Sequence, residues 1–507
     1  MNKNRLFILL FLIELLFVSN LFAQKKEQIN IVNTDLLLGG KDIGEGVRRF
    51  IGNVVFEHNN ATMYCDSAYL YGRQNKIHAF SNVHVTRGDT LHLYGDFMLY
   101  DGNTDIGKFR NNVRLENKET VLYTDSLDFN NATSIAYYFD GGRIVNEQNT
   151  LTSIIGYYYA NDDMFFYKDS VVVTTPDYTI YTDTLKYYTE EKIAYFLGPT
   201  NIYNEENHLY AENGWYRTEE KKFQFNENAR YQNKEKILIG DSLYYDDLNG
   251  IGIAIDNIEM IDTAQNMILK GNYAYYTKEP ESFLITDSTL LIQVSNKADS
   301  LFMHSDSITS NYDSTGTYRI LKAYHKVQMF KSDFQARCDS MVYNFQDSVI
   351  TMYTEPIIWS EGSQMTSKKV EVHMKNDEID FFKLITTAFI ISQADTISKY
   401  NQIRGKEMYG YVRNNELKRV DVFGNGQTIY FTVDEKENEI VGVNSAESSD
   451  IIIHMKQGQV SKINMIKQPS GTLYPLEELK ETKLKDFQWL DYLRPKSKKD
   501  IFDWKQK

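Results

Sequence analysis

The sequence predicts an all-β protein built as an antiparallel repeat array. Three observations lead to this prediction: a strand motif centred on a carboxylate recurs about every 29 residues, aromatic residues are abundant, and proline is scarce. The chain of 507 residues contains 37 Tyr and 28 Phe but only 7 Pro. Because aromatic residues favour strands and proline removes a ladder hydrogen bond, this composition suits a long unbroken sheet.

The strand motif is typified by LYTDSLDFN at residues 122–130, and its central carboxylate provides a landmark for alignment. The aligned positions, spaced 28 to 31 residues apart, are Asp66, Asp96, Asp125, Ser153, Asp183, Glu212, Asp241 and Asn272. A second, apolar landmark follows in step at Val83, Val113, Ile144, Val171 and Ile202. Each period therefore holds two strand segments with turns between them. A period of this length is typical of an array whose units pack only on their neighbours.

Side chains at fixed offsets from the carboxylate form columns. Aliphatic residues lie three positions before it, aromatic residues mostly four positions after it, and a small residue immediately before it. Positions separated by an odd number of residues cannot share one face of a regular strand. Either a bulge at the small residue redirects the strand, or both faces are covered, and the small residue favours the bulge.

The carboxylate column has two interpretations. It could bind calcium, but Ser153 and Asn272 would interrupt such a column, so acceptance of hydrogen bonds from turn hydroxyls and amides is favoured. The nine histidines show no zinc-ligand spacing, and neither nucleophile-elbow nor phosphate-loop motifs occur. We therefore predict no metal, no cofactor and no catalytic residues. A net charge of −14 argues against nucleic-acid binding.

The ends of the chain differ from the array. Residues 1–23 have the charged start and apolar run of a signal peptide, with an uncleaved membrane anchor as the alternative. Residues 468–507 have helical spacing and a Lys-rich end, and this tail could cap the last strand, meet lipid phosphates through Arg494, Lys496, Lys498 and Lys499, or be solvated. Cys65 and Cys338 occupy the same repeat position about nine periods apart, which at one strand spacing per period predicts a separation of about 40 Å and no disulfide.

The repeats GNVVFEHNNATMYCDSAYLY, AFSNVHVTRGDTLHLYGDFMLYDGNT and FRNNVRLENKETVLYTDSLDF resemble the OstA-like family of periplasmic lipopolysaccharide-transport proteins, in the form found in Bacteroidetes. The resemblance is clear from Gly52 to Tyr276, weaker to Ile466 and absent in the tail. It implies a half-open twisted jelly roll, or β-taco, with two such segments in tandem and a short helical tail. The expected divisions are 1–23 signal peptide, 24–47 N-terminal lead, 48–285 first repeat domain, 286–467 second and more divergent repeat domain, and 468–507 tail.

The resemblance also implies a non-enzymatic role in the periplasm. The chain would shield lipopolysaccharide acyl chains in an apolar trough on their way to the outer membrane, with which it could associate. It would pair edge to edge with other transport components, or with its own copies as a homo-oligomer, through Phe50, Val54, Val55 and Phe56. The candidate trough residues are Leu93, Tyr100, Leu122, Leu127, Phe129, Tyr157, Ile180, Leu185, Tyr187, Leu209, Tyr216, Leu238, Tyr245, Leu269 and Tyr276.

Two alternatives stay open at this point. A structural or adhesive β-solenoid with a closed dry core would use the same columns, and a glycan-cleaving enzyme would need a cleft with paired carboxylates. An opening along one edge between the sheets would distinguish the carrier from both.

Overall fold

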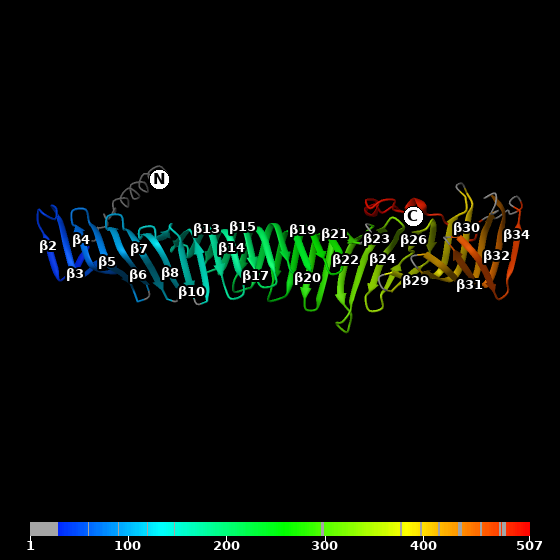
Figure 1. Ribbon diagram of the computed structural model, residues 1–507, viewed down its shortest axis with the longest axis horizontal. Coiled ribbons are helices and arrows are strands. Elements are labelled where there is room, and N and C mark those ends of the chain that lie inside the picture. Colours follow the sequence, from blue (N-terminus) through cyan, green and yellow to red (C-terminus); the bar gives the residue numbers. More distant parts are fainter. Residues whose placement is uncertain are drawn as a thin grey trace, which may run out of the picture. The chain divides into compact units, whose positions relative to one another are not determined.

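The computed structural model describes residues 29–507 except 59, 90, 119, 147, 296–298, 376–377, 396–397, 414–415, 434–438, 457–458, 476–477 and 479–482. The expected signal peptide at residues 1–23 lies outside the described residues. The described chain consists of 34 strands and two 3₁₀ helices, which confirms the all-β antiparallel array (Figure 1). It divides into two compact units, Met1–Glu205 (unit 1) and Glu206–Lys507 (unit 2).

The strands of unit 1 follow one another as antiparallel hairpins. Their turns lie where the sequence places Asn, Asp and Gly, as at residues 102–105 and 131–134. The strands are β1 (Asn30–Asn33), β2 (Leu36–Gly39), β3 (Val47–His58), β4 (Ala61–Tyr71), β5 (Lys76–Arg87), β6 (Leu91–Asp101), β7 (Ile106–Asn117), β8 (Thr120–Asn130), β9 (Ile135–Tyr138), β10 (Gly142–Asn146), β11 (Asn149–Ser153), β12 (Ile155–Tyr159), β13 (Met164–Thr174), β14 (Thr179–Tyr188) and β15 (Ile193–Tyr203).

Each long strand bends at a corner and contributes its two ends to two different half-sheets. β8 pairs with β10 through Thr120–Thr124 and with β9 through Asp128–Asn130. On β3, the ring centroids of Phe50 and Phe56 lie 5.2 Å apart, whereas six residues of a straight strand span about 20 Å. We call the part that carries Leu93 and Leu122 half-sheet A and the part that carries Tyr100 and Phe129 half-sheet B.

A β-bulge forms the corner wherever a strand runs through it, as the odd spacing of the columns predicted, whereas β9 and β10 are separate strands on the two sides of their corner. Ser81 and Asn82 of β5 both lie opposite Asp96 of β6, and both have positive φ, 65° and 51°. The two-against-one pairing reverses the facing of the strand. As a result, Leu93 and Tyr100, seven residues apart, both point inward and are both buried.

The small residue beside the carboxylate lies on the inner side of the corner. A Cβ atom added to Gly95 would come within 3.0 Å of the Phe109 ring, and one added to Gly271 within 2.6 Å of Ile285. Phe109 and Ile285 come from half-sheet B of the neighbouring strand. Side chains of half-sheet B therefore fill the corner. Only a small residue at the adjoining position of half-sheet A leaves room for them.

The carboxylates brace the corners from outside. Asp66 accepts hydrogen bonds from Ser81 (2.6 Å) and Asn82 (2.7 Å), and Asp96 accepts one from Asn112 (2.6 Å). Corresponding bonds join Asn228 to Glu212 and Asn257 to Asp241. The acceptor interpretation is thus confirmed. Within the described residues, no group of three or more His, Cys, Asp or Glu could hold a metal ion.

Unit 2 repeats this construction with longer strands near its end. The expected domain boundary at residue 286 lies inside β21, which pairs with β20 and β22. The strands are β16 (His208–Arg217), β17 (Lys222–Gln232), β18 (Lys236–Asp246), β19 (Ile251–Asp262), β20 (Met267–Lys278), β21 (Glu281–Gln293), β22 (Leu301–Tyr312), β23 (Arg319–Phe330), β24 (Phe334–Asn344), β25 (Val349–Tyr353), β26 (Ile357–Ser360), β27 (Ser363–Thr366), β28 (Lys369–Lys375), β29 (Glu378–Gln393), β30 (Tyr400–Arg413), β31 (Glu416–Val433), β32 (Ile440–Lys456), β33 (Gln459–Ile466) and β34 (Ser470–Tyr474).

The last part of the tail, residues 483–507, is a strap on the outer side of half-sheet A of unit 2 (red in Figure 1). Its helical content is limited to η1 (Asp491–Leu493) and η2 (Asp500–Phe502). Leu490 and Leu493 join Ile357 and Trp359 in a small core outside the array.

Four buried glutamines of half-sheet A hold the strap. Gln364 donates to the Gln488 carbonyl and accepts from the Leu490 amide, both at 2.7 Å. Gln328 donates to the carbonyls of Ile501 and Asp503, Gln335 accepts from Arg494, and Gln402 accepts from the Leu484 amide. Gln328, Gln364 and Gln402 thus provide partners for strap backbone groups, and Gln335 provides one for a strap side chain.

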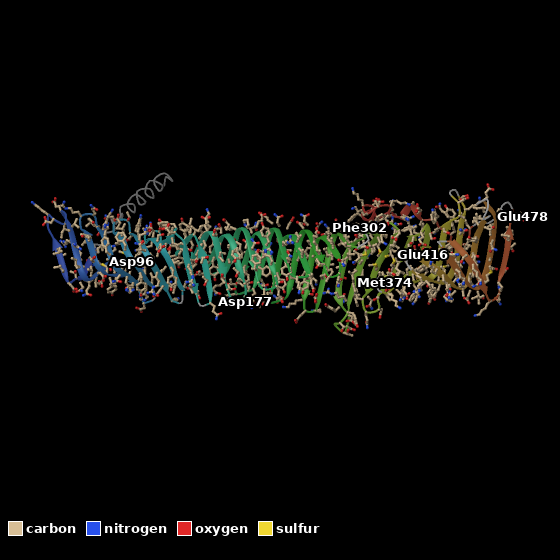
Figure 2. All side chains as sticks on the ribbon, viewed as in Figure 1. Asp96, Asp177, Phe302, Met374, Glu416 and Glu478 are labelled. Atoms are coloured by element: carbon tan, nitrogen blue, oxygen red, sulfur yellow. The ribbon has the colours of Figure 1, made fainter. Side chains whose placement is uncertain are left out.

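The solvated alternative for the tail needs correction, because residues 483–507 pack on half-sheet A. Lys496 pairs with Asp491 (2.6 Å), and Lys498 lies 5.5 Å from the ring centre of Phe302, which is labelled in Figure 2. Contact of this basic cluster with lipid phosphates stays a prediction. Cys65 and Cys338 are both buried free thiols, and burial raises the pKa of each to about 12.

Removing a corner carboxylate should loosen its repeat. We expect Asp66→Ala to weaken local protection by about 1 kcal/mol, or roughly fivefold, because two hydrogen bonds to residues with positive φ are lost. Hydrogen exchange of peptides covering residues 77–87 measures this. Asp125→Ala is the matched control, since Asp125 holds the same position without a hydrogen bond or ion pair to any described residue. Equal loosening by both variants would contradict the bracing role.

Removing a glutamine under the strap should release it. We expect Gln364→Ala to weaken strap docking by about 1–3 kcal/mol, because one buried N–H and one buried C=O lose their partners. Trypsin cleavage at Lys485 should then accelerate roughly tenfold. Gln346→Ala, in an exposed turn, provides the control; unchanged cleavage of the Gln364 variant would refute this account of the strap.

Candidate lipid-binding site

The inward side chains of half-sheet B form a continuous row across unit 1. Neighbours in this row are paired residues of adjacent strands: Leu70, Ile77, Tyr100, Gly107, Phe129, Ala136, Tyr158, Phe165, Tyr187 and Ala194. We call it the aromatic row. In unit 2, a row of the same kind runs through Tyr216, Phe223, Tyr245, Gly252, Tyr276 and Phe283.

Large and small side chains alternate along much of the aromatic row. The Phe129 ring lies over Gly107, where an added Cβ would approach it to 2.2 Å. Tyr158 and Phe165 stack with centroids 4.6 Å apart. The rings therefore lie along the wall, and a glycine or alanine beside a large residue leaves them the space to do so.

Half-sheet A supplies a facing aliphatic row. In unit 1 it includes Met63, Leu93, Leu115, Leu122, Leu151 and Ile180. The two rows thus line the same interior from its two walls, with the corner between them. Leu127 and Leu185 lie next to the corner and are buried.

Burial separates the predicted trough residues into two groups. The buried ones are Leu93, Tyr100, Leu122, Leu127, Ile180, Leu185 and Leu269. The half-buried ones are Phe129, Tyr187, Leu209, Tyr216, Leu238, Tyr245 and Tyr276. In unit 1, inward residues next to the corner are covered, whereas the aromatic row is half-exposed from Phe129 to Tyr187.

Tyr157 is an error in the predicted set. Its partner in β9 is Tyr137, which hydrogen-bonds Asp128 on the outer side. Ser153 is buried and takes the small-residue position, while the exposed Ile154 takes the corner position. The alignment at Ser153 was therefore one residue early, and Tyr158 is the inward residue.

The inward residues of the intervening strands were missed. Ile77, Phe165, Phe223 and Phe283 belong to the rows, but the alignment followed only carboxylate-bearing strands. A regular spacing could have found them, since Ile77, Gly107 and Phe165 each lie six residues before the apolar landmarks Val83, Val113 and Val171.

Five tyrosines of the rows have a raised pKa. Burial raises the pKa of Tyr158, Tyr216, Tyr245 and Tyr276. Burial also raises the pKa of Tyr100, whose hydroxyl donates to Asp105 at 2.5 Å. The lining is thus uncharged and largely apolar.

The predicted pairing edge also needs correction. β3, with Phe50, Val54, Val55 and Phe56, is covered by β4 on one side and by β1 and β2 on the other. Phe50, Val54 and Phe56 point inward and are buried. The edge is instead formed by β1 and β2 of the N-terminal lead, where Leu36, Leu37 and Leu38 are exposed.

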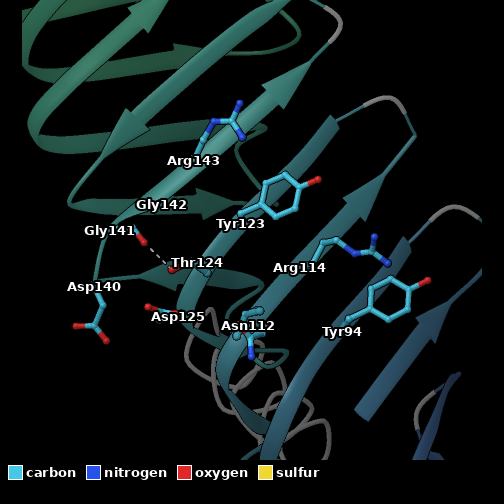
Figure 3. A pocket seen from close by; sticks show the side chains of 11 residues that line it. Tyr94, Asn112, Arg114, Tyr123, Thr124, Asp125, Asp140, Gly141, Gly142 and Arg143 are labelled. Carbon is cyan, nitrogen blue, oxygen red and sulfur yellow. Dashed lines mark hydrogen bonds between the residues drawn. The ribbon is translucent and has the colours of Figure 1, made fainter. Parts of the chain in front are cut away.

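A cavity of about 560 Å³ lies on the outer side of unit 1 (Figure 3). It is lined by Tyr94, Asn112, Val113, Arg114, Tyr123, Thr124, Asp125, Asp140, Gly141, Gly142 and Arg143. Thr124 donates to the Gly141 carbonyl (2.7 Å), so the corner here is closed by a backbone contact. The cavity is separated from the interior rows by the wall of half-sheet A.

Comparison with known proteins gives a family match and a similar solved structure. The family model described as OstA-like protein matches residues 26–183 and 177–236. No curated protein matches the chain. One similar solved structure is LptH from Pseudomonas aeruginosa, "the LptA homologous periplasmic component of the conserved lipopolysaccharide transport device", with 12% identity over 28% of this chain and 96% of that chain, and a TM-score of 0.22.

Residues 26–236 therefore match the OstA-like family model, in agreement with the resemblance found in the repeats. The match spans the stretch in which the corners and rows are most regular. Among the described residues, no helix has the length and apolar character needed to cross a membrane.

Proposed function

We propose that the chain is a non-enzymatic periplasmic carrier or bridge that shields lipopolysaccharide acyl chains between its two half-sheets. The observation that supports this most is the half-exposed aromatic row from Phe129 to Tyr187, opposite an aliphatic row. A wall of this kind offers an acyl chain uniform apolar contact without a recognition centre. Residues 26–236 match the OstA-like family model, and lipopolysaccharide transport is the role that the resemblance of the repeats implies.

The physical chemistry of the lining supports the same cargo. Each CH₂ group transferred from water to an apolar lining gains about 0.8 kcal/mol, so a chain of a dozen groups would be held by contact alone. The neutral tyrosines add surface without charge. The corner holds the two walls together on one side, so that cargo would enter at the strand ends opposite it.

A closed dry core is the second candidate, and one observation favours it locally. From Leu70 to Gly107, the inward residues are buried, as a sealed core requires. The half-exposure that begins at Phe129 favours the carrier for the following strands. A glycan-cleaving role finds less support, because the corner carboxylates of Asp66 and Asp96 are engaged by Asn and Ser side chains.

The exposed β1–β2 edge supports pairing with another chain. Its leucines and the free strand edge suit strand addition by a second transport component or a second copy. Export through the signal peptide at residues 1–23 would place the chain where such components act.

Cargo should be captured from inside the rows. We expect a photo-crosslinking residue at Phe129 or Tyr187 to capture purified lipopolysaccharide, because both side chains face the interior. The same residue at Asn130, on the opposite face of β8, is the matched control. A charged residue at Tyr187 should also reduce binding about tenfold. Equal capture from Phe129 and Asn130 would argue against an inward binding surface.

Pairing should depend on β2. We expect the chain to self-associate at high concentration and expect either Leu37→Pro or Leu38→Pro to abolish this. Adjacent residues of a strand direct their N–H groups to opposite sides, so one of the two prolines removes an outward donor and the other removes a bond to β3. Sedimentation velocity measures association, and circular dichroism checks folding. If neither well-folded variant loses association, the contact lies elsewhere.

A further inference from the structure

The end of unit 1 next to β1 and β2 contains a cavity of about 680 Å³. It is lined by Ile29, Ile31, Gly39, Gly40, Lys41, Gly44, Glu45, Gly46, Val47, Arg48, Leu70, Gly72, Arg73 and Asn75. We call it the mouth cavity. Nothing in the corner or in the cargo rows requires charge here, yet its lining is sharply divided into an apolar part and a cationic part.

The apolar part continues the interior rows. Leu70 is the first apolar residue of the aromatic row and is 7% exposed, and Ile29 is 8% exposed. Ile31 pairs with Phe56, on the inward side of half-sheet A, and is 39% exposed. The cavity therefore opens onto the same apolar surface as the proposed cargo path.

The cationic part lies at the strand ends farthest from the corner. Arg48 is paired with Leu70, so it extends the aromatic row by one strand, and it is exposed. Lys41 lies in the turn between β2 and β3, and Arg73 in the turn after β4. Neither Lys41 nor Arg48 forms an ion pair with any described residue. Arg73 pairs with Glu45 at 3.1 Å, with both side chains well exposed.

The balance of charge is unusual for this chain. Three cations and one carboxylate line the mouth cavity of a protein whose net charge is −14. A phosphate monoester carries about −1.5 to −2 charges near neutral pH and accepts several hydrogen bonds. Two unpaired cations with a third beside them match that charge.

The glycine-rich turn makes room for such a group. Gly40, Gly44 and Gly46 have positive φ values of 143°, 122° and 80°. No heavy atom lies within 4 Å of the position that a Cβ would take on Gly39 or Gly40. A ligand can therefore approach the turn backbone closely beside Lys41.

We propose that the mouth cavity binds the phosphate headgroup of an amphiphile, with Arg48, Lys41 and Arg73 as its contacts, while the alkyl chain lies over Leu70 toward the aromatic row. This inference rests on the proposed cargo path and adds a polar recognition site to it. The expected ligand is a lipid phosphate and not free phosphate, because cationic and apolar side chains line the same cavity.

The test compares two amphiphiles of equal chain length, dodecyl phosphate and dodecyl glucoside, below their micelle concentrations. Binding to the chain without its signal peptide is measured by displacement of a fluorescent fatty-acid probe. We expect the phosphate to bind about tenfold more tightly at low salt. The triple variant Lys41→Gln, Arg48→Gln, Arg73→Gln should lose this preference and still bind the glucoside within about twofold of the parent.

Arg143→Gln is the matched control, because Arg143 is an exposed arginine on the outer side of unit 1. It should retain the full preference. Inorganic phosphate alone should not displace the probe, and if it did so as well as dodecyl phosphate, the commitment to a lipid would be wrong. A preference that survives the triple variant would overturn the headgroup site while leaving the cargo path intact. Failure of both amphiphiles to bind the parent chain would overturn the proposed function and this site with it.

Discussion

The repeats of this chain depend on the corner, the bend at which a long strand passes from one half-sheet into the other. Three residue types make the corner: a small residue inside, a carboxylate outside, and two bulge residues with positive φ opposite the carboxylate. Gly95, Asp96 and the pair Ser81–Asn82 show the arrangement. The corner reverses the facing of the strand, so that both ends present apolar side chains to one interior. Without the reversal, half of each strand would expose its aliphatic or aromatic column to water.

Much of this architecture could be predicted, because periodicity exposes it. A column of carboxylates, a column of small residues and an odd spacing together require a bulge, and the bulge is present. The prediction failed where the landmark changed. At Ile154 the corner carries no carboxylate, so the repeat pattern selects the polar Ser153 instead and predicts Tyr157 as the inward residue. The strap could not be predicted either, because its four glutamine contacts join residues more than eighty positions apart and follow no repeat.

The edge illustrates a different limit of sequence patterns. β3 is the first long strand of the array, and an apolar strand at the start of an array is expected to be its edge. β1 and β2 are only four residues each and lack the motif, yet they cover β3. Short strands of this kind leave little periodic pattern. As a result, the exposed leucines belong to the N-terminal lead, whereas Phe50 and Phe56 are buried in the core.

The strap and the mouth cavity show how a uniform array acquires local differences. The interior repeats one chemistry, which suits a cargo that slides, but a uniform surface cannot set direction or select a headgroup. Those tasks require residues that break the repeat. In unit 2, the departures are outward-facing glutamines that bind the chain's own backbone. In unit 1, they are Arg48, at a position that the next strands fill with apolar residues, and the glycine-rich turn beside it. Because Arg48 is exposed and adds nothing to apolar packing, the proposed headgroup site gives this cation a role at the end of the row.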